Sequence, residues 1–305
     1  MHRLIATALC ALFLFSTGSF AAERERLGYG RLITNDLIGD GRDRWRTGSA
    51  ASSRVWGPAW NGSLPGRFGD IIELRFNAEI LAPENVTIPA AGDRPYAGAI
   101  SVGLHTHYMV NQTEISVGGD LVFTGPQTGL NDFQSLIHDT IGGNDVSSGT
   151  RATQIGDDIN PTLVLEFGRT VQMGQSARIR PFLEGRAGIE TLLRVGADFT
   201  LGQVGQGELL VRDPVTGYRY RTIRNSIPGF SLVVGGDIAY VSDSEFLPSN
   251  QGFKLTDARS RARAGVHWQT KQGHRFFYGL TWMDKEFKGQ RDSQIVGSLR
   301  LNVEF

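Results

Sequence analysis

The last residues of this chain, Ser298–Phe305, alternate polar and apolar side chains without a break and end on an aromatic ring. An alternation with a period of two predicts a β-strand that has one polar and one apolar face. Such a strand suits either the edge of a soluble β-protein or the closing strand of a transmembrane β-barrel. The strand alone does not separate these two classes.

The N-terminus favours the barrel, because it carries an export signal. Arg3 supplies a basic start, an apolar stretch follows, and small residues lead up to Ala22. This pattern predicts a secretory signal peptide over residues 1–22, whose apolar part is too short for a membrane span. The only cysteine, Cys10, lies inside it, so we expect a mature barrel chain, 23–305, without disulfides.

The composition excludes two other classes. Beyond residue 22 the sequence has no apolar run of the length that a transmembrane helix requires. Acidic and basic residues balance at 31 each, which provides no basic surface for a nucleic-acid partner. A transmembrane barrel fits this composition because every second residue of its strands faces a polar lumen. A secreted soluble β-protein fits it as well.

Twelve segments alternate in the manner of strands, an even number as single-chain bacterial barrels require. In residues 70–80, Ile72 and Leu74 lie on one face, while Glu73 and Arg75 lie on the other. We therefore predict an all-β fold, a transmembrane antiparallel 12-stranded β-barrel with a short helix in an outer loop. The predicted strands are 27–34, 47–56, 70–80, 99–110, 114–123, 162–169, 178–189, 192–201, 231–241, 259–268, 275–282 and 298–305.

The polar faces of these strands carry many ionisable side chains. A soluble sandwich would expose them to water, whereas a narrow barrel must pair them across its lumen. Aromatic residues near strand ends, such as Tyr29 and Trp268, suit the girdles at the membrane interfaces. The side chains expected to form ion pairs are Arg178, Arg180, Arg186, Arg259, Arg261, Arg263, Asp120, Glu166 and Glu184.

The connections between strands have two lengths. With both termini in the periplasm, the long gaps face outside, the longest being 124–160, and three short turns face the periplasm, as in known barrels. Two periplasmic links, 57–69 and 202–230, are longer than this rule predicts. The turn of the second link at 212–218 indicates an additional hairpin below the wall.

The outer gaps hold the candidate metal-binding and catalytic residues. Asn35 and Asp36 offer hard oxygen ligands of the kind that calcium prefers, although Asn and Asp clusters also make ordinary turns. Residues 131–141 have helical apolar spacing, which predicts a short amphipathic helix against the outer rim. His138 on this helix is either a surface residue or a general base. Beyond residue 22 neither a cysteine nucleophile nor a Gly-x-Ser-x-Gly elbow supports covalent catalysis.

Several motifs resemble, in order and spacing, those of the outer-membrane lipid A 3′-O-deacylases of the LpxR type. The most distinctive are Asp93-Arg94-Pro95-Tyr96-Ala97-Gly98 before a strand and Gln134-x-x-x-His138 after a Gly-Pro turn. Thr34-Asn35-Asp36, the segment 43–48 and Gln154-Ile155 complete the set. The match covers residues 28–168, and the rest is matched by its barrel pattern.

The resemblance implies a calcium-dependent hydrolase at the outer rim of the barrel. Its substrate would be the ester-linked acyloxyacyl group at the 3′ position of lipid A. Carried over by position, Asn35 and Asp36 would place the calcium, Thr47 would line the site, and His138 would activate the attacking water. Asp145 stands where family members often carry an acidic residue after the histidine, and by this resemblance it would be a third metal ligand.

We therefore expect a monomeric bacterial outer-membrane esterase that acts on lipopolysaccharide among outer-membrane lipids. Two departures from the family pattern bear on its substrate preference: residues 81–95 contain no lysine, and Arg151-Ala152-Thr153 replace the usual Gly-Trp. Two alternatives remain open at this stage. One is a catalytically silent porin-like or structural barrel, and the other is a rim phospholipase.

Overall fold

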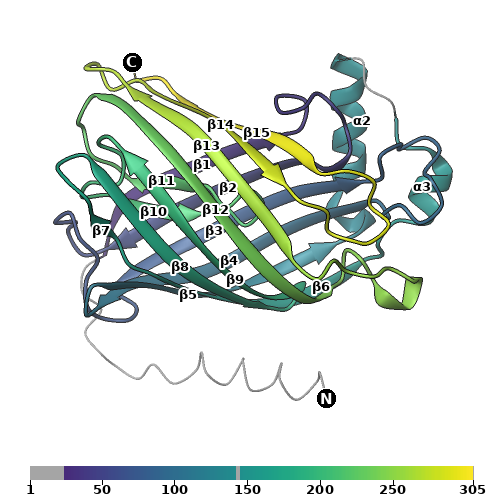
Figure 1. Cartoon of the computed structure of the whole chain (residues 1–305), viewed down its shortest axis with the longest axis horizontal. Coiled ribbons are helices and arrows are strands. Elements are labelled where there is room, and N and C mark those ends of the chain that lie inside the picture. The colour runs from purple at the N-terminus through teal and green to yellow at the C-terminus, as the bar shows by residue number, and fades with distance from the viewer. Residues whose placement is uncertain (1–23, 142–144, 305) are drawn as a thin grey trace.

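The molecule is a closed antiparallel β-barrel (Figure 1). The computed structural model describes residues 24–141 and 145–304, and the predicted signal peptide lies outside this part of the chain. One sheet runs in the order β6-β5-β4-β3-β2-β1-β15-β14-β13-β12-β9-β8-β7, and pairing of β6 with β8 closes it. Because β7 continues β6 along β8, the described wall has twelve strand positions, as predicted.

The wall strands overlap all twelve predicted segments. They are β1 (Glu25–Asn35), β2 (Trp45–Gly57), β3 (Ile71–Ala82), β4 (Ala97–Val110), β5 (Thr113–Thr124), β6 (Asp158–Gly168), β7 (Val171–Gln172), β8 (Ala177–Ala187), β9 (Glu190–Leu201), β12 (Gly229–Ser244), β13 (Arg259–Gln269), β14 (Arg275–Met283) and β15 (Gln294–Asn302).

The last strand differs from its predicted bounds. β15 begins before residue 298 and ends at Asn302 instead of continuing to the terminus. Asn302 pairs with Arg275, the first residue of β14, so no partner backbone in β14 remains for Val303 and Glu304.

Burial in the wall is inverted relative to a soluble protein. On β3, Glu73 is 0% exposed and Arg75 8%, whereas Leu74 is 36% and Phe76 41% exposed. The same alternation places the arginines of β13 inside and Trp268 outside. A barrel surrounded by lipid requires this arrangement, because its exterior meets hydrocarbon and its interior holds the polar groups.

The described helices do not cross a membrane, since none of them is long and apolar enough. The predicted outer-loop helix is present as α2 (Leu130–Ile141), and it starts just before the predicted Asn131, following Gly129 at a φ of 66°. The same loop contains the 3₁₀ turn η1 (Pro126–Thr128) and a second helix, α3 (Ser148–Ala152), which the pattern analysis did not predict. A further turn, η2 (Ser249–Gln251), lies between β12 and β13.

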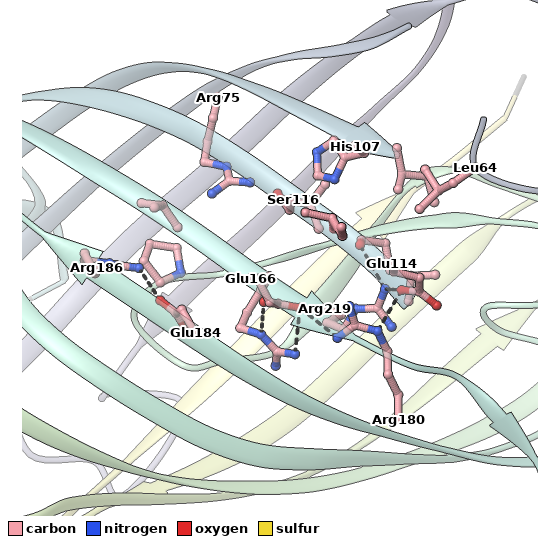
Figure 2. A pocket seen from close by; sticks show the side chains of 17 residues that line it. Leu64, Arg75, His107, Glu114, Ser116, Glu166, Arg180, Glu184, Arg186 and Arg219 are labelled. Atoms are coloured by element: carbon pink, nitrogen blue, oxygen red, sulfur yellow. Dashed lines mark hydrogen bonds and ion pairs between the residues drawn. The ribbon is translucent and has the colours of Figure 1, made fainter. Parts of the chain in front are cut away.

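Ion pairs fill the lumen, as the charge pattern predicted (Figure 2). Glu166 accepts from Arg180 Nη1 at 2.7 Å and from Arg212 Nε at 2.6 Å, and Arg186 pairs with Glu184 at 2.9 Å. Arg178 departs from the prediction, because within the described residues its guanidinium donates to the Gly202 carbonyl and forms no ion pair.

The long link 202–230 is a plug, not a hairpin below the wall. Its strands β10 (Leu209–Arg212) and β11 (Arg219–Ile223) lie inside the barrel (Figure 1). Val211 and Tyr220 of these strands and Tyr218 of the turn between them are buried against the wall residues Leu32, Ala51 and Phe277. The sequence did not predict this position, because the hairpin alternates like a wall strand. Arg212 shows its place, since its acidic partners Glu166 and Asp198 lie in the lumen.

We expect Asp237→Asn to destabilise the barrel. The Asp237 carboxylate accepts from Arg261 at 2.9 Å and Arg263 at 2.5 Å and lies 3.2 Å from Arg194, thereby joining β12, β13 and β9. Removing one partner of a buried ion pair costs about 3–5 kcal/mol. The temperature at which the folded band disappears in a heat-modifiability gel should fall, whereas exposed Asp243→Asn on the same strand should leave it unchanged. Equal melting of both variants would contradict this assignment.

Candidate functional site

The loop between β1 and β2 begins with an Asx turn at Asn35. The Asn35 Oδ1 accepts from the Leu37 N–H at 2.8 Å, and its Nδ2 donates to the Thr47 carbonyl at 3.0 Å. Both polar ends of this side chain therefore hold the loop to the start of β2. Asn and Asp side chains favour such turns because they bond their own backbone two residues on.

The same loop folds outward over the lipid-facing side of β14 and β15. Tyr278 Oη donates to the Ile38 carbonyl at 2.8 Å, and a Cβ on Gly297 would lie 2.1 Å from that carbonyl oxygen. Asp40 N donates to the Ile295 carbonyl at 3.0 Å, so the loop replaces β1 as the neighbour of β15 at this rim. Leu37 remains 57% exposed on this side.

A β-bulge places Thr47 in the site. Arg46 pairs with Leu81 and Gly48 with Ile80, which leaves Thr47 as the extra residue of β2. Bulges redirect side chains and are common next to active sites. The Thr47 hydroxyl lies 2.7 Å from Asp43 Oδ1 and 3.3 Å from Asp36 Oδ2, so two carboxylates converge on it.

Asp36 is a buried carboxylate without an ion-pair partner in the described part of the chain. It is 1% exposed, and its Oδ2 accepts from the Arg44 N–H at 2.8 Å. Burial raises the pKa of Asp36 to about 8, the Arg44 and Thr47 hydrogen bonds oppose this shift, and the neighbouring carboxylates of Asp43 and Asp40 add to it. A carboxylate in such surroundings is stabilised by a bound cation.

The donor chemistry of this loop fits a hard divalent cation. Asp36 and Asp43 supply carboxylate oxygens and Thr47 a hydroxyl, all of the type that calcium binds. No group of three or more His, Cys, Asp or Glu side chains suited to a metal occurs among the residues that the structure describes. Further ligands would therefore be backbone carbonyls or water, which calcium sites use freely.

Two motifs far apart in the sequence meet beside this loop. Tyr96 is 1% exposed, and its hydroxyl donates to Gln134 Oε1 on α2 at 2.9 Å. The Gln134 Nε2 is buried and has no hydrogen-bond partner among the described atoms. His138 follows Gln134 by four residues, so the two positions lie on the same face of α2. The His138 side chain itself is outside the described residues.

Electrostatics connect Tyr96 to both the loop and the helix. Burial raises the pKa of Tyr96, Arg151 opposes this rise, and the carboxylates of Asp43 and Asp132 strengthen it. Arg151 of α3 in turn donates to Asp132 Oδ1 at 3.2 Å and to Ser135 Oγ at 3.1 Å. Arg151 thus fastens α3 to α2.

The outer loops share a further carboxylate, Glu286. It accepts from Arg46 Nε at 2.6 Å and from Arg94 Nη1 at 2.7 Å, and so joins β2, the loop before β4 and the loop after β14. The three surrounding arginines, Arg46, Arg94 and Arg259, outweigh burial and hold the pKa of Glu286 far below its usual range. Arg94 of the Asp-Arg-Pro-Tyr motif therefore has a structural role, because it links the loop before β4 to the loop after β14.

The predicted site residues divide into three groups. Asn35, Asp36 and Thr47 lie together in one hydrogen-bonded loop. His138 belongs to the helix that Tyr96 attaches beside that loop. Asp145 is exposed before α3, next to Val146, which is buried with Val86 and Tyr96. Three further residues, Asp43, Tyr96 and Gln134, belong to the site but were not predicted as site residues, although all three lie within the family-like motifs.

A closed wall with an apolar exterior, a charged lumen and a loop-rich rim defines an outer-membrane β-barrel. More particularly, the chain belongs to the family of outer membrane protein LpxR, whose family model matches residues 6–305. The protein therefore resides in the bacterial outer membrane, as predicted. No curated protein matches the chain in sequence.

Solved structures of similar fold include LpxR from Salmonella typhimurium, with a TM-score of 0.71 at 17% identity over 89% of this chain and 98% of that one. The monoaromatic hydrocarbon channel CymD has a TM-score of 0.41 at 14% identity, covering 90% of this chain and 86% of that one. The first likeness supports the fold, and the second is too weak to support any argument.

We expect Tyr96→Phe to loosen α2 while the barrel stays intact. The substitution removes the hydroxyl that donates to Gln134 and leaves a second buried polar group of that amide without a partner, at a cost of about 1–3 kcal/mol. Hydrogen exchange of the α2 amides should accelerate, with no change in the exchange of β12 and β13. Tyr108→Phe on the opposite rim is the matched control. Unchanged α2 exchange in Tyr96→Phe would show that the Tyr96–Gln134 hydrogen bond does not hold α2 in place.

Proposed function

We propose that this protein is a calcium-dependent lipid A 3′-O-deacylase, an ester hydrolase that acts at the outer leaflet as a monomer. The observation that carries the proposal is the convergence of Asp36, Asp43 and Thr47 beside the Tyr96–Gln134 contact that attaches the His138 helix. Cation ligands and a general base thus come from adjacent rim elements of one chain. Membership of the LpxR family supports the same assignment.

The residues have separate tasks in this proposal. Asp36, with Thr47 and Asp43 around it, would hold the calcium, which when bound stabilises negative charge on the ester oxygen. Asn35 shapes the loop through its turn. His138 takes the proton of the attacking water, and Gln134 Nε2, one helical turn before it, has no hydrogen-bond partner among the described atoms. Together these groups provide what ester hydrolysis needs.

The surface around the site suits a lipid substrate. Phe133 is 53% and Leu136 64% exposed on α2, and Leu37 is 57% exposed on the adjoining loop. A charged, hydrogen-bonded site therefore adjoins apolar side chains at the edge of the membrane. An acylated saccharide such as lipid A, with its ester between sugar and hydrocarbon, matches both surfaces.

The test measures fatty acid released from purified lipopolysaccharide by the detergent-solubilised protein, with mass spectrometry of the remaining lipid A. We expect Asp36→Asn and His138→Asn each to lower the rate about 100-fold or more, as loss of a catalytic base does, and a calcium chelator to act like Asp36→Asn. Asp257→Asn, exposed on the same rim, is the control and should keep full activity.

The alternatives give different products. A silent barrel would release no fatty acid from any substrate even though heat modifiability shows it folded. A rim phospholipase would release fatty acid from phospholipid vesicles and leave lipid A at its original mass. Either result would overturn the proposed substrate, and activity that persists in His138→Asn would overturn the mechanism.

A further inference from the structure

Neighbouring full-length strands of the described wall pair over different lengths, and the shortest pairing is that between the first strand, β1, and the last, β15. We call this junction the seam. Only Ile33–Asn35 pairs with Gly297–Leu299, whereas β14 and β15 pair from Arg275 to Met283. Over the described residues, β1 has no partner in β15 from Leu32 towards the periplasmic end. Tyr29 Oη bridges this open part of the seam by donating to Asn302 Oδ1 at 3.0 Å.

The plug closes the open seam from inside. A Cβ on Gly28 would lie 2.1 Å from the Thr222 carbonyl oxygen, so β11 packs directly on β1 there. Arg300 Nη1 donates to the Arg221 carbonyl at 2.7 Å and ties β15 to the same hairpin. The remaining access to the seam is from the membrane side, where unpaired backbone groups are costly.

Four arginines gather at the seam. Three of them are exposed on β1 and β2, and the fourth, Arg224, reaches the Tyr29 ring from the segment that follows β11. The guanidinium carbons of Arg26 and Arg31 lie 5.6 Å from the Tyr29 ring centroid, and that of Arg224 lies at 4.7 Å. Arg54 stands directly opposite Tyr29 on β2. We call Arg26, Arg31, Arg54 and Arg224 the seam arginines.

The seam arginines lack direct carboxylate partners in the described part of the chain, although Arg224 helps Arg275 to lower the pKa of the exposed Glu304 carboxylate. None of them forms an ion pair with a residue that the structure describes, whereas Arg180, Arg212 and Arg263 in the lumen each have two acidic partners. Glu304, the acid that follows β15, is held by Arg275 at 2.7 Å. Arg224 Nη1 is also buried without a hydrogen-bond partner among the described atoms. The cluster therefore has both excess positive charge and a free donor.

We propose that the seam arginines bind the phosphate of an anionic phospholipid from the inner leaflet. Their position near the periplasmic end of β1 and β2 corresponds to the headgroup level, and Tyr29 has the amphipathic ring typical of that level. Ile33, 59% exposed, lies nearer the membrane centre than the arginines of β1, and Leu301, 65% exposed, lies at the periplasmic end of β15, so both offer apolar surface for acyl chains. Arginine recognises phosphate through charge-assisted, often bidentate hydrogen bonds. This site is on the opposite rim from the proposed hydrolase site and independent of it.

The test counts lipids retained by the full-length mature protein in native mass spectrometry, after exchange into detergent micelles containing equal phosphatidylglycerol and phosphatidylcholine. We expect wild type to retain phosphatidylglycerol preferentially. Arg26→Gln/Arg31→Gln should weaken retention about fivefold for each arginine removed. Arg224→Gln should weaken it as well. Arg67→Gln, 79% exposed on the same rim, is the matched control and should behave as wild type.

Three results would overturn the proposal. The first is equal retention of phosphatidylglycerol by wild type and by the folded Arg26→Gln/Arg31→Gln variant. The second is an equal loss in Arg67→Gln, which would indicate a diffuse charge effect. The third is displacement of the lipid by inorganic phosphate at matched concentration, which would assign the cluster to a soluble oxoanion. Retention restored in Arg26→Lys/Arg31→Lys would support the charge-based reading.

Discussion

Charge pairing inside a closed wall is the constraint on which the rest of this structure depends. The strand backbones satisfy one another around the ring, so hydrocarbon can surround them, but the side chains directed inward must neutralise each other within a narrow space. Glu166 and Asp237 do so for several strands at once. The plug hairpin belongs to the same network, because Arg212 contributes to it from inside the lumen.

The sequence predicted the wall because strands with two different faces alternate apolar and polar residues with a period of two. The exposed Leu74 beside the buried Glu73 agrees with this pattern. It did not predict the plug position, because residues 209–223 alternate like any strand and only the partners of Arg212 and Tyr220 reveal the lumen. The end of β15 was also missed. Strand ends depend on where the neighbouring strand stops, which local pattern does not contain.

For the candidate site, motif order selected Asn35, Asp36, Thr47 and His138, but it did not assign their contacts. Asn35 turned out to use both ends of its side chain within the loop, while Asp43 shares the Thr47 hydroxyl with Asp36. The tie from Tyr96 to Gln134 joins segments that are distant in the chain. Such contacts follow from closure of the barrel, which brings alternate loops to one rim.

The β1–β2 loop lies on the outside of the wall, with Ile38 over Gly297 and Leu37 projecting into the surroundings. The barrel consequently has two layers of chain at β14 and β15 near this rim, the strands and the loop that covers them. Acyl chains there would meet loop side chains before strand side chains. Since Asp36 starts this same loop, its carboxylate lies within two residues of side chains that contact the lipid phase.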